Sequence, residues 1–326
     1  MSSEKYGLGL WIFGKLLDRF VSQGYKTGVP FQERIRLVSR IELLRGIELT
    51  YPSDFNSRSP EEILKILREH NLEISGIDID LFSEPRWQRG SITSKDDKLR
   101  MEAIKRVKDA IDIARKMGVK NVIIWPGQDG HDYLFSDHRE RWRRLIDAMK
   151  EVSSYCIDET IYLEYKPKEP RTHSILSNVG KTLHLIERVG SSKLGVLIDV
   201  GHALMADENL AESVFLIHDS GLPLFLHLND AYGYWDDDMI MGSINLWKFV
   251  EFFHALETIK YDGWYDLDIF PYREDPVKAS EQCLKFIHYL RTKVREYHDD
   301  ISDAISAENV HKALEIVWKT FLRDFR

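Results

Sequence analysis

The chain has 326 residues, of which 43% are hydrophobic and 30% are charged, and its formal net charge at pH 7 is −8. This composition is typical of a folded globular protein with a large core, and it excludes a disordered chain. The acidic balance lacks the basic stripe that neutralises phosphates, so we expect no nucleic-acid partner. The length fits either two average domains or one α/β barrel of about 250 residues with additions.

The two cysteines, Cys156 and Cys283, lie far apart in helical patterns. They therefore predict neither a disulfide framework nor a thiolate zinc site. The first residues are polar, and the chain contains no run of about 18 apolar residues that would span a bilayer. We expect a cytoplasmic protein that makes no contact with membranes.

Short β-rich runs alternate with amphipathic helical stretches along the chain. The predicted strands cover residues 6–13, 46–51, 72–80, 121–125, 161–166, 195–200, 224–228 and 264–269. Helical periodicity predicts helices between them, for example over residues 94–117, 137–157 and 178–189. Continuous apolar runs at 122–124 and 196–198 indicate a parallel sheet buried on both faces. Eight repeats of strand and helix predict an α/β fold of the (β/α)8 TIM-barrel type.

No linker rich in glycine or serine interrupts this pattern. We therefore predict one catalytic barrel domain over residues 1–295, followed by a C-terminal helical arm over residues 296–326. Ser306 is predicted to cap the last helix. Its apolar stripe consists of Val310, Leu314, Val317 and Phe321. Such a stripe must be buried either against the chain's own barrel or against a neighbouring subunit. We expect a homo-oligomer, either a dimer or a tetramer.

Acidic and imidazole side chains lie at or just beyond the ends of the later strands. They are Glu164, Asp199, His202, His227, Asp236, Asp238, Asp266 and Asp268, with Lys166 beside the first. Catalytic groups of a TIM barrel lie at this end of the strands. Carboxylate and imidazole ligands suit Mn²⁺, Mg²⁺ or Co²⁺ better than they suit zinc held by thiolates. The sequence therefore predicts a divalent-metal enzyme.

Taken one at a time, these motifs have a second interpretation. Glu164 and Lys166 are two residues apart on a strand, so both can point into the lumen, and a buried ion pair without chemistry would also explain them. A histidine three residues after Asp199 is also common on solvated loops. An acidic triplet around Asp237 is often solvated surface, although alternate aspartates can chelate one cation while Asp237 faces away.

The last strand offers two aspartates on the same face, Asp266 and Asp268. Either can complete a metal site with the residues of the preceding strands. We favour Asp268 because it lies nearer the carboxyl end of the strand, where the other candidate ligands converge.

Together these segments resemble the xylose isomerase family over almost the whole barrel. The matching segments are Gly9-Leu-Trp11, Leu81-Phe-Ser-Glu-Pro85 followed by Ser94, Trp125-x-Gly-x-x-Gly130, Glu164-x-Lys-Pro-x-Glu-Pro-Arg171, Val200-Gly-His202, Asp236-x-Asp238-x-x-x-Gly242 and Asp268-x-x-Pro-x-Arg273. The resemblance implies an aldose–ketose isomerase that acts on a sugar with two divalent ions.

The resemblance also implies roles for individual residues. Glu164, Asp199 and Asp268 would hold a structural ion, and Asp199, His202, Asp236 and Asp238 a catalytic one. Lys166 would hydrogen-bond the substrate carbonyl oxygen, so the catalytic set is Lys166 with His202 and Asp238. Phe82 and Trp125 would line the sugar-binding pocket. Trp11 matches another position of this pocket, and its role stays open.

Three features depart from the family pattern. The family's catalytic histidine after strand two, assigned to opening the sugar ring, has no counterpart in residues 49–54. Asp199 replaces a glutamate, and the aspartate of strand seven aligns with Asn229, which leaves His227 to serve as the ligand. The last two changes resemble the related L-rhamnose isomerases. The substrate is therefore not fixed as xylose.

In the implied reaction, hydride moves between C1 and C2 of an open-chain sugar, and two cations with Lys166 stabilise the charge on its oxygens. A ketose 3-epimerase of the same superfamily is the alternative enzyme, with one metal and two glutamates that exchange a proton. A DNA-repair nuclease would need three zinc ions, more histidines and a basic groove. A non-catalytic sugar sensor would bind metal without turnover.

Overall fold

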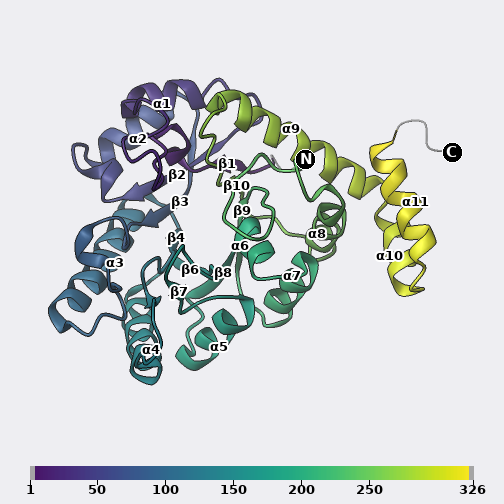
Figure 1. Ribbon diagram of the computed structural model, residues 1–326. Coiled ribbons are helices and arrows are strands. Elements are labelled where there is room, and N and C mark those ends of the chain that lie inside the picture. The colour runs from purple at the N-terminus through teal and green to yellow at the C-terminus, as the bar shows by residue number, and fades with distance from the viewer. Residues whose placement is uncertain (1–3, 323–326) are drawn as a thin grey trace.

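Eight parallel strands form a barrel in the computed structural model, which describes residues 4–322 (Figure 1). In order around the barrel they are β1 (Tyr6–Leu8), β2 (Gly46–Tyr51), β3 (Glu73–Ile79), β4 (Asn121–Ile124), β6 (Thr160–Glu164), β8 (Leu194–Asp199), β9 (Leu224–Leu228) and β10 (Tyr265–Leu267). A bridge between Gly9 and Glu48, together with a hydrogen bond from Arg45 N to Tyr6 O, joins the two edges of the sheet. The predicted TIM barrel is confirmed.

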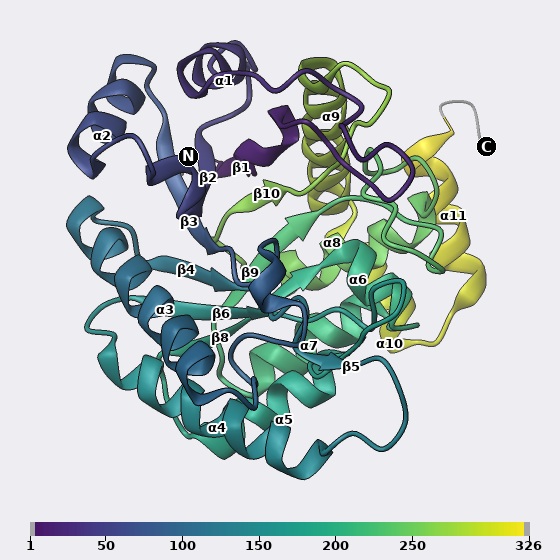
Figure 2. The same ribbon diagram turned by 60° about the vertical axis from the view of Figure 1, so that its left-hand side comes forward.

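Helices cover the outside of the barrel, as both views show (Figures 1 and 2). They are α1 (Phe31–Val38), α2 (Pro60–Glu69), α3 (Asp97–Met117), α4 (His138–Tyr155), α5 (Val179–Val189), α7 (Leu210–Asp219), α8 (Leu246–Thr258) and α9 (Pro276–Glu296). Local sequence sets their ends. The Asp96 side chain caps the start of α3, and Gly118 and Gly190 end α3 and α5 at φ 72° and 71°, where a side chain would be strained.

Short elements occupy the loops around the barrel. They are η1 (Leu10–Phe13), η2 (Ser53–Phe55), η3 (Pro85–Trp87), α6 (Val200–Met205) and an antiparallel pair formed by β5 (Gly130–His131) and β7 (His173–Ser174). In the described part of the chain, no helix is both long enough and apolar enough to cross a membrane.

The first predicted strand, residues 6–13, was too long. β1 ends at Leu8, Gly9 N donates to Leu267 O, and the chain then turns into η1. The prediction failed because Leu10, Ile12 and Phe13 are all buried, and a buried turn carries the same apolar residues as a buried strand. This turn brings Trp11 to the end of the barrel where the predicted ligands lie.

The C-terminal arm consists of α10 (His298–Ser306) and α11 (Val310–Phe321), beyond the end of α9. The prediction that Ser306 caps the last helix was wrong. Ser306 is the last residue of α10, and the cap of α11 is Asn309, whose side chain accepts a hydrogen bond from Lys312 N. A turn at 307–309, which the apolar pattern did not reveal, separates the two helices.

The buried face of α11 is rotated from the predicted stripe. Ile316 and Thr320 are buried, whereas Val310 and Leu314 are 66% and 41% exposed. Val317 and Phe321, the other two residues of that stripe, pack against the core, and the Phe321 ring meets Trp247 with centroids 5.3 Å apart. The arm therefore packs against its own chain through part of the stripe.

Truncating the buried side chain of α11 tests this packing. Ile316→Ala should lower the free energy of unfolding by about 2–5 kcal/mol, because it removes buried methyl groups and leaves a cavity. Leu314→Ala, on the exposed side of the same helix, should change it by less than about 0.5 kcal/mol. Denaturant unfolding of both variants measures the difference, and equal losses would contradict the observed orientation of α11.

Candidate metal centre

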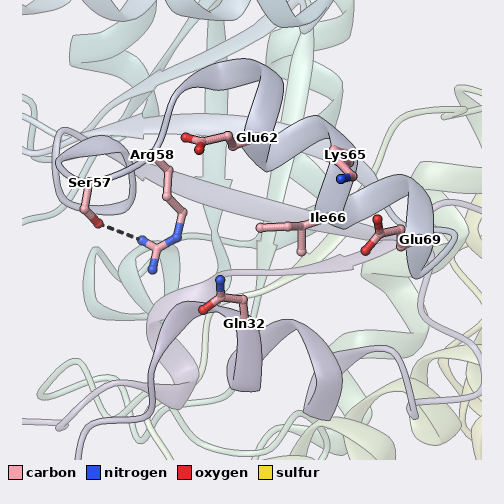
Figure 3. A pocket seen from close by; sticks show the side chains of 7 residues that line it. All are labelled: Gln32, Ser57, Arg58, Glu62, Lys65, Ile66 and Glu69. Carbon is pink, nitrogen blue, oxygen red and sulfur yellow. Dashed lines mark hydrogen bonds between the residues drawn. The ribbon is translucent and has the colours of Figure 1, made fainter.

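A cavity of about 1130 Å³ opens at the carboxyl ends of the barrel strands. Its lining includes Glu164, Lys166, His202, His227, Asp236, Asp238 and Asp268, with walls formed in part by Trp11, Phe82 and Trp125. Asp199 is fully buried beneath it. A second cavity, of about 370 Å³, lies on the outside between α1 and α2 (Figure 3). Its lining residues include neither histidine nor cysteine.

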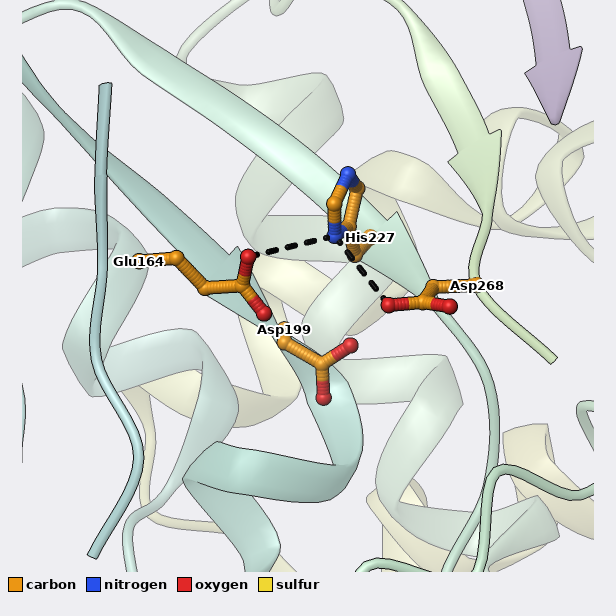
Figure 4. Close-up of side chains that lie close together, drawn as sticks. All are labelled: Glu164, Asp199, His227 and Asp268. Atoms are coloured by element: carbon orange, nitrogen blue, oxygen red, sulfur yellow. Dashed lines mark ion pairs between the residues drawn. The ribbon is translucent and has the colours of Figure 1, made fainter. Parts of the chain in front are cut away.

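Four of the predicted ligands form one compact group, which consists of Glu164, Asp199, His227 and Asp268 (Figure 4). Each offers one ligand atom, and these atoms all lie within 4.8 Å of one another. His227 Nδ1 is 3.7 Å from Glu164 Oε2 and 3.5 Å from Asp268 Oδ2. Three of the residues lie on β6, β8 and β9, and Asp268 directly follows β10, so parallel strand ends create the group.

The two nitrogens of His227 have different surroundings. Nε2 lies 3.0 Å from Oε2 of Glu48, which is completely buried on β2. Nδ1 is buried without a hydrogen-bond partner and faces the carboxylates of the group. A ligating histidine typically has one nitrogen held by a carboxylate and the other free for the ion. The residues present therefore fit a divalent cation.

A second group consists of Asp199, His202 and Asp236. Asp199 caps the short helix α6, and its Oδ1 accepts a hydrogen bond from His202 N at 2.9 Å. This capped turn explains why Asp199 and His202 are three residues apart in the sequence. His202 Nε2 lies 3.1 Å from Asp236 Oδ2, and its Nδ1 is 3.2 Å from Glu164 Oε1. Asp199 thus belongs to both groups and lies between them.

Lys166 is buried beside the second group. Its Nζ lies 2.7 Å from Asp236 Oδ2 and 2.5 Å from Glu169 Oε1, and it stands 4.9 Å from the centre of the Trp125 ring. The ion pair with Glu164 that the sequence left open is not formed; the partners come from later segments. Burial alone would lower the pKa of Lys166, but Asp236 and Glu169 raise it, so the side chain remains an ammonium.

Two other predicted aspartates, Asp238 and Asp266, lie outside both groups. Asp238 lines the cavity, and Asn229 Nδ2 reaches its Oδ1 at 3.4 Å. Asp237 accepts from Tyr232 N and does not line the cavity. Asp266 is completely buried in the barrel, where a Cβ on Gly7 would lie 1.9 Å from its Oδ1. The compact group of candidate ligands thus includes Asp268 and not Asp266.

Asn229 holds Asp199 in place. Its Nδ2 donates to Asp199 Oδ2 at 2.8 Å, while its Oδ1 accepts from Gly201 N at 2.7 Å. Asn229 therefore orients a candidate ligand in this chain, at the position where the sequence resemblance led us to compare an aspartate. On β9 the residue that offers a candidate ligand atom is His227.

Electrostatics favour a cation at this end of the barrel. Burial raises the pKa of Asp199 to about 7, and the charges of Asp236 and Asp268 contribute in the same direction. Burial and the same neighbours raise the pKa of Asp238. Burial would also raise the pKa of Glu164, but the adjacent imidazoles of His202 and His227 lower its pKa to about 2. A bound divalent ion would relieve this crowding of negative charge.

Aromatic side chains form the walls around the acidic groups. Trp11 Nε1 donates to Asp268 Oδ1 at 2.6 Å, so the residue whose role the sequence left open orients a candidate ligand. The rings of Phe82 and Trp125 meet edge to face with centroids 4.4 Å apart. Such walls exclude water and strengthen electrostatic interactions inside the cavity.

Two functional candidates, Glu48 on β2 and Asp78 on β3, were not predicted from the sequence. Glu48 supports His227, and Asp78 lines the cavity. The available signal was an acidic residue between two apolar neighbours inside a predicted strand, in Ile47-Glu48-Leu49 and Ile77-Asp78-Ile79. Residues 49–54 lack the histidine that the sequence resemblance led us to look for. In this segment Asp54 accepts hydrogen bonds from the Arg34 side chain and from Thr50 N.

A parallel barrel with carboxylates and histidines at its strand ends is the architecture of a metal-dependent TIM-barrel protein. Residues 36–290 match the family described as xylose isomerase-like TIM barrel, and the chain belongs to that family. It is 26% identical over 284 residues to the xylose isomerase of Thermus thermophilus and 26% identical over 247 residues to that of Thermus caldophilus. These alignments cover 84% and 72% of this chain, and 68% and 64% of those enzymes.

Solved structures of similar fold include an L-ribulose 3-epimerase, with a TM-score of 0.74 and 17% identity over 92% of this chain and 98% of that one. Another is a D-allulose 3-epimerase from Methylomonas sp. in complex with D-allulose, with a TM-score of 0.68 and 18% identity over 88% of this chain and 96% of that one. These likenesses concern the fold.

Replacing the carboxylate behind His227 tests the first ligand group. Glu48→Gln should weaken the binding of Mn²⁺ at that group about 10- to 100-fold, because the amide orients and polarises the imidazole less well. Calorimetric titration of the metal-free protein measures this change. Asp266→Asn, which alters another buried carboxyl outside both ligand groups, is the matched control and should leave the affinity nearly unchanged. Equal affinities for Glu48→Gln and wild type would contradict the assignment.

The raised pKa of Asp199 predicts a pH dependence of metal binding. Near neutral pH its carboxyl is partly protonated in the metal-free protein, so an incoming ion must displace a proton. Between about pH 7 and 6 the affinity for Mn²⁺ should fall roughly tenfold for each proton displaced. Calorimetry in buffers of different ionisation enthalpy measures both affinity and proton release. Binding that releases no proton at pH 6 would count against the shared role of Asp199.

Proposed function

We propose that the protein is an aldose–ketose sugar isomerase that uses two divalent ions, with Mn²⁺, Mg²⁺ and Co²⁺ as candidates, together with Lys166. The observation that carries the proposal is the pair of ligand groups sharing Asp199, with a buried ammonium beside the second group. The similarity to two xylose isomerases supports it.

In this proposal the first ion is held by Glu164, Asp199, His227 and Asp268. Asp199, His202 and Asp236 hold the second, with Asp238 beside them at the rim of the cavity. The bound ions would polarise the oxygens of the sugar and stabilise the negative charge that develops during transfer of hydride between C1 and C2.

Lys166 positions the substrate carbonyl. An ammonium carries three N–H donors, and Glu169 and Asp236 accept two of them. The third is free to donate to the carbonyl oxygen of an open-chain sugar. Phe82 and Trp125 keep bulk water from the same space, which strengthens that hydrogen bond.

A one-metal ketose 3-epimerase is the second candidate. Two observations favour it: Lys166 already pairs with Asp236, and Asp238 lies outside the second group, so the first group is the more complete one. Glu164 and Asp268 would then be the two carboxylates that exchange the proton at C3.

Isotope transfer separates the two reactions. Pentoses, hexoses and deoxyhexoses are first screened with each ion, and the best aldose is then used with deuterium at C2. An isomerase that moves hydride keeps the deuterium in the ketose at C1. If instead the protein converts ketoses only, and C3 exchanges its hydrogen with solvent, the isomerase proposal is wrong and the epimerase is supported.

Lys166→Met tests the assigned ammonium. Loss of one hydrogen-bond donor to developing charge should lower kcat about 10²- to 10³-fold, while the protein stays folded. Lys168→Met, an exposed residue of the same loop, is the matched control and should keep the wild-type rate. Steady-state kinetics with the best aldose measure both variants. A Lys166→Met protein with the wild-type kcat would remove Lys166 from the mechanism.

A further inference from the structure

An aldose isomerase needs a way to open the sugar ring, and this inference rests on the proposed function. Aldoses in water are mainly cyclic hemiacetals, whereas hydride transfer between C1 and C2 requires the open chain. Opening moves a proton from the hydroxyl on C1 to the ring oxygen. The histidines that line the cavity, His202 and His227, both belong to the ligand groups. Another group must therefore move this proton.

Asp78 is the cavity carboxyl without an assigned partner. It lies near the carboxyl end of β3, in register with Thr50 of β2 and Ile123 of β4, and it is 8% exposed. It lines the same cavity as Lys166 and Trp125. Within residues 4–322 no side chain or backbone group forms a hydrogen bond or ion pair with its carboxyl. Because the carboxyl lines the cavity, a ligand in that cavity can reach it.

The two neighbouring aspartates, Asp80 and Asp54, already have hydrogen-bond or ion-pair partners within the protein. Asp80, two residues further on, accepts hydrogen bonds from Phe82 N, Ser83 N and the Ser83 hydroxyl. Asp54 is paired with Arg34 and accepts from Thr50 N. On this side of the cavity, Asp78 is therefore the aspartate free to meet a substrate.

The surroundings of Asp78 also favour its protonated form. Burial raises the pKa of this carboxyl well above its ordinary value, and the negative charges of Glu48 and Glu164 add to the effect. A protonated carboxyl has a proton on one oxygen and a lone pair on the other. It can donate and accept at the same time.

We propose that Asp78 opens the sugar ring by moving one proton with each of its two carboxyl oxygens. The protonated oxygen gives its proton to the ring oxygen, and the bond between C1 and that oxygen breaks with its electron pair staying on oxygen. The other carboxyl oxygen takes the proton from the hydroxyl on C1, where the carbonyl double bond forms. The carboxyl ends with one proton, as it began, so no further reactant is needed.

The experiment compares a cyclic and an acyclic substrate in the same variant. D-Glyceraldehyde is too short to close into a five- or six-membered ring, so its conversion to dihydroxyacetone needs no opening step. Asp78→Asn should lower the ratio of kcat/KM for the best cyclic aldose to kcat/KM for glyceraldehyde by about 10²- to 10⁴-fold. Because the ratio is taken within one protein, incomplete folding cancels. Asp80→Asn is the matched control and should leave the ratio unchanged.

A second measurement follows the opening step itself. Magnetisation exchange in NMR reports how fast the two anomers of the aldose interconvert in the presence of the metal-loaded protein. The wild type should accelerate this exchange, and Asp78→Asn should not. An unchanged ratio together with unchanged anomer exchange in Asp78→Asn would overturn the role of Asp78 while leaving the isomerase intact. A wild-type protein that converts no sugar would overturn the proposed function, and this inference with it.

Discussion

Repulsion between carboxylates is the constraint on which the site depends. A parallel barrel brings all its strand ends to one mouth, and in this chain Glu164, Asp199, Asp236 and Asp268 converge there with Asp238 nearby. Buried like charges are costly, so such a set persists only with positive charge beside it. Lys166 and two histidines supply part of that charge. A divalent cation can displace the imidazole protons, and the imidazole nitrogens and carboxylate oxygens then suit it as ligands.

A layer of supporting contacts holds the ligands in place. Asp199 is fixed by its capping bond to α6 and by Asn229, His227 by Glu48, and Asp268 by Trp11. Apart from the capping bond, each support comes from a different strand or loop than the residue it holds. The geometry is therefore set by the fold before any ion binds, which is what a catalytic metal site requires.

Much of the fold and many of the ligands were predictable because the physical signals are local. Apolar runs gave all eight strands, and acids at strand ends gave the candidate ligands. The alternating pattern could not reveal Glu48 or Asp78, since an acid inside a strand acquires meaning only when the lumen it faces is known. Likewise, one of the two partners of Lys166, Asp236, comes from a loop 70 residues further along the chain. The cap of α11 is Asn309 rather than Ser306, because turn residues compete locally.

In the proposed site, two cations bind side by side through the shared carboxylate of Asp199. Anomalous diffraction from crystals soaked in Mn²⁺ measures this arrangement directly. We expect two peaks, one among Glu164, Asp199, His227 and Asp268 and the other among Asp199, His202 and Asp236. A single peak confined to the first group, or no peak at either, would contradict it.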